Sequence, residues 1–167
     1  KIEEEKYTKF ILPKINKFRE VLKSNNTISF LHYGHLGDII NSLPAIKEIS
    51  KTKKCNLYIQ KDKNIPEHVV SKDHTFGSVY LSENAILKML PLLKKQKYLN
   101  KVEIYDNHEI NIDLNFFREL QINFNIDSIR WYFHLTGCFP ELSKNYLEVS
   151  SNPKFSDYIV VMRSLRR

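Results

Sequence analysis

The stretch HYGHLGD, which ends at Asp38, brings together side chains that could do chemistry. Gly34 and Gly37 are two of the four glycines in the chain, and they stand beside His32 and His35. Glycine lets a ligand or another backbone approach closely. An exposed carboxylate such as Asp38 can take a proton from a hydroxyl group. The stretch is therefore a candidate site for binding and for general-base chemistry.

Asp38 has two physical explanations. In the first turn of a helix, a carboxylate caps free N–H groups and complements the helix dipole, and local chemistry favours this structural role. The other role is a general base that faces a crevice. Both common cofactor loops are disfavoured, because Gly34-x-x-Gly37 lacks the third glycine of a dinucleotide fingerprint and no Gly-Lys-Ser/Thr of a P-loop follows.

Hydrophobic periodicity predicts the elements that must position this stretch. Helices are expected over 3–23 with an interruption at Pro13, from 38 onward with an interruption at Pro44, over 83–97 behind a Ser82 cap, and over 127–137 between Asp127 and Gly137. Strands are expected over 27–33, 55–60, 101–106 and 157–164, while 111–117 fits a strand or a turn and 61–79 fits a loop with one short helix.

Alternating strands and helices favour an α/β fold, with a Rossmann-like parallel sheet and helices on both faces. Ligands of such sheets gather at the carboxyl ends of the strands. HYGHLGD stands at that end of the first predicted strand. Asp106 follows the third one and is expected to face the same crevice.

Composition narrows the class of protein. The chain has 167 residues, a length that fits one compact domain or one domain and the start of another. Of these residues 42% are hydrophobic, which is typical of a globular protein and unlike a disordered segment. Its net charge of +7 favours anionic partners such as nucleotides, phosphosugars, acidic glycolipids or nucleic acid. Lysines are scattered except at 51–54 and 94–97, and no aromatics interleave with these clusters, so nucleic acid is not expected.

Other signals are absent from the sequence. There is no apolar run long enough to span a membrane, no signal peptide and no metal-ligand spacing around Cys55 and Cys138. We expect a cytoplasmic chain with free thiols.

The segment LHYGHLGDIINSLPAIKEISKTKKCNLYIQ resembles the opening of the heptosyltransferase-like glycosyltransferases, family nine, of GT-B fold. The resemblance rests on Gly37-Asp38, on the apolar pair after it and on Leu43-Pro44. A looser similarity to a bacterial group of such proteins covers NIDLNFFRE, SIRWYF and the tail through YIVVMRS.

This resemblance implies two Rossmann-like lobes. Residues 1–150 would form the N-terminal, acceptor-binding lobe, and 151–167 a linker and first strand of a donor lobe that is missing or truncated here. Asp38 maps onto the catalytic base of an inverting transfer from a nucleotide-sugar to a hydroxyl of a surface glycan or protein. The resemblance implies no metal or other cofactor, and an inactive enzyme as this chain alone. His32 and His35 depart from the pattern of the family.

The residues expected at the site are Asp38 as base and Gly34, Gly37, His32, His35, Asp106 and Arg118 as substrate-binding groups. For Arg118 two interpretations stay open, a pair with a carboxylate or a contact to an anionic acceptor. The alternative function is a non-catalytic α/β module that binds nucleotides or a protein partner through a basic crevice. Peripheral contact with the inner membrane face and the oligomeric state are left open.

Overall fold

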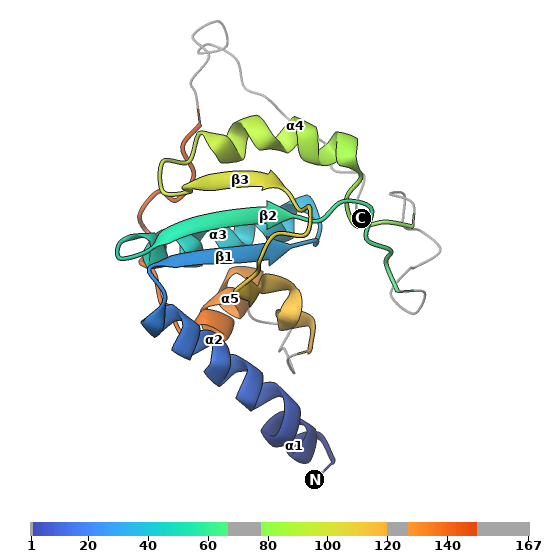
Figure 1. The fold of residues 1–167 in the computed structure, drawn as a ribbon, viewed down its shortest axis with the longest axis vertical. Helices are drawn as coiled ribbons and strands as arrows, with labels where there is room; N and C mark the ends of the chain where they lie inside the picture. The colour runs from blue at the N-terminus through green and yellow to red at the C-terminus, as the bar shows by residue number, and fades with distance from the viewer. Residues whose placement is uncertain (1, 67–77, 120–126, 150–167) are drawn as a thin grey trace, which may run out of the picture.

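The computed structural model describes residues 2–66, 78–119 and 127–149. Its centre is a parallel sheet of four strands in the order β3-β2-β1-β4, flanked by helices (Figure 1). The predicted α/β class and parallel sheet are confirmed. The strand expected over 157–164 and the domain boundary at 150 lie outside the described residues. The strands are β1 Thr27–His32, β2 Lys54–Ile59, β3 Lys101–Ile104 and β4 Ile112–Asp113.

The helices fall close to the predicted ranges. They are α1 Ile2–Lys6, the π-helix η1 Tyr7–Ile11, α2 Leu12–Ser24, α3 Leu36–Ser50, α4 Glu83–Lys94, the 3₁₀ helix η2 Leu114–Glu119 and α5 Ser128–Thr136. The first helix is interrupted as expected, and Pro13 sits in the first turn of α2, where its missing N–H group costs little. The interruption expected at Pro44 is wrong, because α3 runs through this residue. Residues 111–117 supply both a short strand and a helical turn.

The helix signals predicted at Ser82 and Gly137 are confirmed. The Ser82 hydroxyl accepts a hydrogen bond from the Ala85 N–H group at 3.3 Å, and Gly137 ends α5 with φ of 73°. Asp127 precedes α5 but makes no side-chain cap, so that part of the prediction is wrong.

The two faces of the sheet differ in chemistry. One face carries the buried side chains of Ile28, Phe30 and Leu57. Helix α3 lies behind the sheet in Figure 1, and α5 packs against α3. The opposite face carries polar residues and is crossed by the connection from β3 to β4. In this connection the His108 ring stacks on the Tyr58 ring, with 4.1 Å between the ring centres. In the part of the chain that the structure describes, a loop takes the place of the helix expected on this face.

A segment after α5 crosses the amino ends of the strands. The Tyr98 hydroxyl donates to the carbonyl oxygen of Tyr146 at 2.6 Å. The buried Gln96 amide donates to the carbonyl oxygen of Glu148 at 3.0 Å and accepts from the Glu148 N–H group at 2.8 Å. Residues 138–149 are thereby fixed along this end of the sheet. Among the described helices, none is both long and apolar enough to cross a membrane.

Candidate functional site

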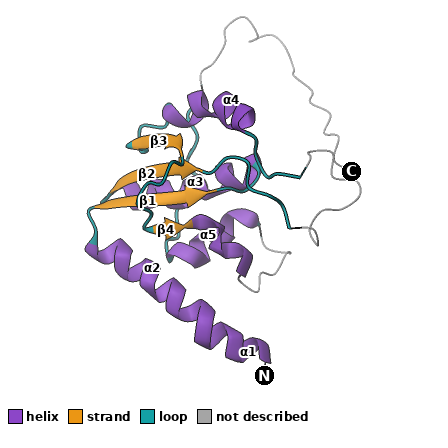
Figure 2. Ribbon diagram, turned by 45° about the vertical axis from the view of Figure 1, so that its right-hand side comes forward, coloured by secondary structure: helices purple, strands orange, loops and turns teal. Residues whose placement is uncertain are grey.

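The strand order reverses direction between β1 and β4, which makes this place a topological switch point of the sheet, called the switch point below. The chain builds the sheet outward from β1 through β2 to β3 and then returns to the other side of β1 (Figure 2). The carboxyl ends of strands at such a point form the usual ligand crevice of open parallel sheets. Asp38 follows β1, Arg118 follows β4, and Asp38 Oδ2 lies 3.0 Å from Arg118 Nη2. One ion pair therefore bridges the switch point.

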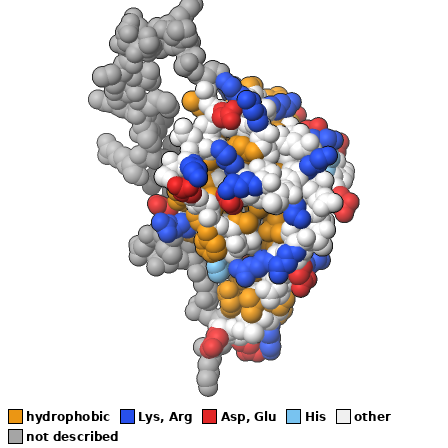
Figure 3. Space-filling view, turned by 90° about the vertical axis from the view of Figure 1, so that its left-hand side faces the viewer, with side chains coloured by type: hydrophobic (Ala, Val, Ile, Leu, Met, Phe, Trp, Pro, Cys, Tyr) orange, Lys and Arg blue, Asp and Glu red, His pale blue; other side chains and the backbone are white. Residues whose placement is uncertain are grey.

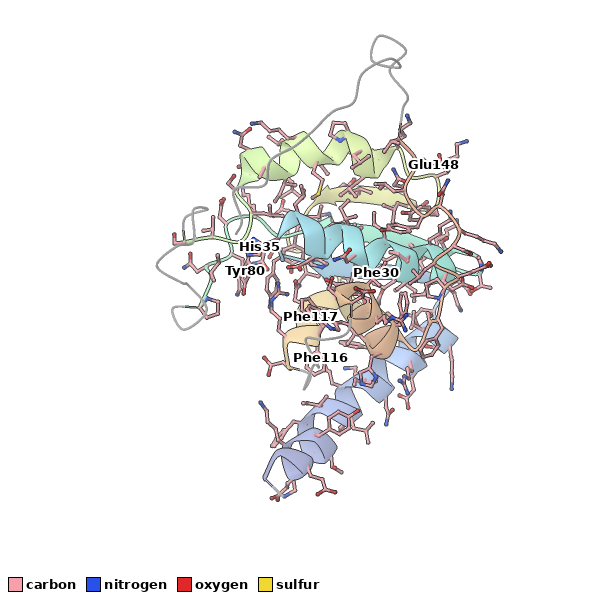
Figure 4. All side chains as sticks on the ribbon, turned by 180° about the vertical axis from the view of Figure 1, so that it is seen from behind. Phe30, His35, Tyr80, Phe116, Phe117 and Glu148 are labelled. Atoms are coloured by element: carbon pink, nitrogen blue, oxygen red, sulfur yellow. The ribbon has the colours of Figure 1, made fainter. Side chains whose placement is uncertain are left out.

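A pocket of about 640 Å³ opens beside this ion pair. The first turn of α3 forms one wall, and the segment before α4 together with the start of α5 forms the others. His35 and Tyr80 lie together at this end of the sheet, whereas Glu148 lies at the opposite end (Figure 4). The lining residues are His35, Leu36, Gly37, Asp38, Asn41, Val79, Tyr80, Leu81, Ser82, Ala85 and Ser128.

The Asp38 carboxylate has a confirmed structural role. Its Oδ2 atom accepts a hydrogen bond from the N–H group of His35 at 3.0 Å, as the capping interpretation predicts, and a second from Arg118. Neither bond uses Oδ1. The two bonds orient the carboxylate and leave Oδ1 outside both of them. Asp38 also lines the pocket.

Arg118 is fixed by aromatic rings as well as by charge. Its guanidinium carbon lies 4.4 Å from the ring centre of Phe117, 4.9 Å from Tyr80 and 5.7 Å from Tyr33. Of the two interpretations of Arg118, the pair with a carboxylate is confirmed. A planar cation that is stacked in this way makes a rigid partner for Asp38.

The two glycines of the loop have different surroundings. A Cβ atom on Gly34 would lie 2.7 Å from Asp38 Oδ2, 2.7 Å from His32 Cε1 and 2.9 Å from Arg118 Nη2. A Cβ atom on Gly37 would meet nothing within 4 Å, and Gly37 lines the pocket. Close approach is thus essential at Gly34, whereas Gly37 leaves open space.

His32 is buried, which corrects its prediction as a substrate contact. The N–H group of Gly34 donates to His32 Nδ1 at 2.9 Å, so Nε2 carries the hydrogen and donates to the Tyr132 hydroxyl at 3.0 Å. Burial, and then the charge of Arg118, lower the pKa of His32 from 6.5 to about 3. His32 is therefore a neutral ring that stabilises the loop through the hydrogen bond from the Gly34 N–H group. Burial, and then the charge of Asp38, also raise the pKa of Tyr132.

The neutral state of His32 makes stability depend on pH. Between pH 6.5 and about 3 the unfolded chain binds the extra proton. The contribution of His32 to the free energy of unfolding is therefore complete above pH 6.5. It is lost by about 1.4 kcal/mol per pH unit as pH falls toward 3. Denaturant titrations from pH 7 to 4 should show a shallower loss for His32→Gln than for the parent. His134→Gln, at an exposed position, should keep the parent slope. Equal slopes for all three proteins would contradict a neutral buried His32.

The structure gathers most of the predicted site residues. His35 lines the pocket, and its Nδ1 lies 3.2 Å from the carbonyl oxygen of Tyr80. Asp106 is exposed, donates its backbone N–H to His108 Nδ1 at 3.1 Å and does not line this pocket. The pocket beside Asp38 therefore does not include Asp106, and the crevice expected to unite the two residues stays a prediction.

Sequence reasoning missed three residues that build the site. Asn115 Oδ1 accepts from the N–H group of Tyr33 at 2.9 Å, and Tyr132 anchors His32. Tyr80 comes from a segment without periodicity, so no pattern marked it. Asn115 is a polar residue two positions after the end of β4, and this placement was a usable signal.

A search for metal-ligating side chains and comparisons with known proteins bear on the chemistry and identity of the chain. Among the described residues, no three side chains of His, Cys, Asp and Glu come together as a metal site, and the expectation of a metal-free reaction stays a prediction. Comparisons with protein-family models, with curated proteins and with solved structures find no match to this chain.

Proposed function

We propose that this chain is the acceptor-binding half of a sugar transferase, with Asp38 as the general base. A single observation carries the proposal: an oriented carboxylate borders an open pocket at the switch point of a parallel sheet. The resemblance of the Gly37-Asp38 and Leu43-Pro44 segment to GT-B transferases gives the reaction class.

The proposed reaction is a displacement at the anomeric carbon of a nucleotide-sugar. Asp38 Oδ1 takes the proton of an acceptor hydroxyl while that oxygen attacks the carbon, and the nucleoside diphosphate leaves with the bonding electron pair. Arg118 holds the other carboxylate oxygen, so the base keeps one geometry through the transfer.

A non-catalytic binding module is the second candidate. It is favoured by the cap and ion pair of Asp38, which explain this aspartate without chemistry. Residues of the first turn of α3 and of the start of α4 also line the same pocket, and helix N-termini suit an anion.

Ligand titration of the 167-residue chain separates the two candidates. We expect oligosaccharides, with or without phosphate groups, to shift the amide signals of Gly37, Asn41 and Ser82 in NMR spectra. UDP-, GDP- and ADP-hexoses should leave these signals unchanged, because the proposed donor site lies on another lobe. Nucleotides that move the same signals while no saccharide does would favour the binding module and contradict the transferase proposal.

A further inference from the structure

Four segments form one face at the amino ends of the strands, which we call the amino-end face. They are residues 23–26, 51–54, 94–101 and 138–149. The first three connect a helix to the next strand, so a parallel sheet places them all at the same end. Together they contain nine lysines against two glutamates, namely Lys23, Lys51, Lys53, Lys54, Lys94, Lys95, Lys97, Lys101 and Lys144 against Glu141 and Glu148.

Two of these nine lysines form ion pairs with carboxylates in the part of the chain that the structure describes. Lys51 pairs with Glu48, and Lys144 pairs with Glu141. Lys54, Lys97 and Lys101 are exposed and take part in none of the ion pairs that join described residues. The face therefore presents a concentrated positive potential to the solvent.

Exposed apolar side chains lie within the same face. Phe139 is 79% exposed, Val149 67% and Leu142 39%. Their segment is held in place, because Gln96 and Tyr98 bind its backbone and Lys47 Nζ donates to the carbonyl oxygen of Asn145 at 2.6 Å. Figure 3 looks onto this side of the molecule and shows hydrophobic side chains with lysine and arginine side chains around them.

We propose that the amino-end face docks on an anionic lipid bilayer. Lysines beside a negatively charged leaflet each add to binding, and aromatic and aliphatic side chains between them enter the headgroup region. The amino-end face carries both kinds of group, the lysines and the exposed apolar side chains, and the segment with the apolar side chains is held in place. The proposal stands apart from the chemistry of the Asp38 pocket, which lies at the other end of the strands.

Lipid suits this face better than nucleic acid. All nine basic residues are lysines, which act as point charges, whereas bidentate recognition of phosphate favours arginine. The exposed side chains include the aliphatic Leu142 and Val149, which offer no stacking surface to a base.

Vesicle sedimentation tests the electrostatic half. With vesicles of phosphatidylcholine and phosphatidylglycerol in a 7:3 ratio, we expect the protein to pellet in 0.1 M salt and to be released in 0.5 M salt. Pure phosphatidylcholine should leave it in the supernatant. The triple variant Lys54→Gln, Lys97→Gln, Lys101→Gln should bind on the order of 100-fold more weakly, because each lysine contributes a factor of about five.

A charge-matched control guards against an effect of net charge alone. The variant Lys14→Gln, Lys17→Gln, Lys88→Gln removes three exposed lysines of α2 and α4 that lie outside the amino-end face. It should bind the anionic vesicles within about threefold of the parent. Equal losses for the two triple variants, or no binding by the parent, would overturn the proposal.

Phe139→Trp tests the apolar half. Anionic vesicles should shift the emission of the new tryptophan to shorter wavelength, measured against the parent, whose one tryptophan is Trp131. Unchanged emission of pelleted Phe139→Trp protein would overturn this face as the contact. Salt-dependent binding of a 20-nucleotide poly(U) RNA without binding to anionic vesicles would overturn the lipid assignment in favour of nucleic acid.

Discussion

In a protein that carries the proposed donor lobe, Asp38→Asn is expected to lower kcat for sugar transfer by roughly 10²- to 10⁴-fold, the range that a general base contributes. Asparagine has nearly the same shape, and its carbonyl oxygen can still accept from the His35 N–H group, so the cap survives. What disappears is the negative charge that takes the proton. Steady-state transfer from a nucleotide-sugar, with the acceptor saturating, measures this loss.

Arg118→Gln is the matched control for Asp38→Asn. It breaks the same ion pair, whose side chains are 24% and 23% exposed, but leaves the carboxylate in place. Each variant should lose about 1 kcal/mol of stability, because a partly exposed pair contributes little more. The loss of kcat in Arg118→Gln should be at least tenfold smaller than in Asp38→Asn. Equal losses, or an Asp38→Asn enzyme that transfers at the parent rate, would leave Asp38 with a structural role alone.

Gly34→Ala is expected to lower the free energy of unfolding by about 2–3 kcal/mol, near the upper end for an overpacked site. The added methyl group would lie 2.7 Å from both Asp38 Oδ2 and His32 Cε1. The Arg118 side chain can move aside, but the buried His32 ring has both nitrogens engaged and cannot turn without losing a hydrogen bond. Chemical denaturation at pH 7 measures the change.

The same substitution at Gly37 provides the comparison. Its Cβ atom would meet nothing within 4 Å, and alanine in a helix restricts the unfolded chain, so Gly37→Ala should be neutral or gain up to about 1 kcal/mol. Similar destabilisation by both substitutions would show that loop flexibility, and not contact at Gly34, sets the cost.

Short-range signals predicted much of the fold and part of the site. The Asp38 cap, the Ser82 cap and the end of α5 at Gly137 each depend on neighbours within four residues, and the structure has all three. Alternation of strands and helices was enough for a parallel sheet. Order within that sheet, and with it the switch point, came only from the structure.

Long-range partners explain what the sequence could not predict. The ion pair of Asp38 joins residues 80 positions apart, and the hydrogen bond that buries His32 reaches Tyr132, 100 positions away. Without these partners the sequence could not decide whether His32 contacts a substrate or makes an ordinary backbone hydrogen bond at the end of its strand, and the structure shows the hydrogen bond. The lysine clusters at 51–54 and 94–97 are separated in the sequence but lie at the same end of the sheet, because each comes just before a parallel strand.

Strand length sets the distance between the two ends of this molecule. A six-residue strand such as β1 spans about 20 Å at roughly 3.3 Å per residue. A protein that rests on a bilayer by its lysines would hold the Asp38 pocket at about that height, facing the aqueous side. An acceptor anchored in the same bilayer would then need an extended polar spacer to bring its hydroxyl to Asp38, whereas a sugar attached directly to its lipid would be too short.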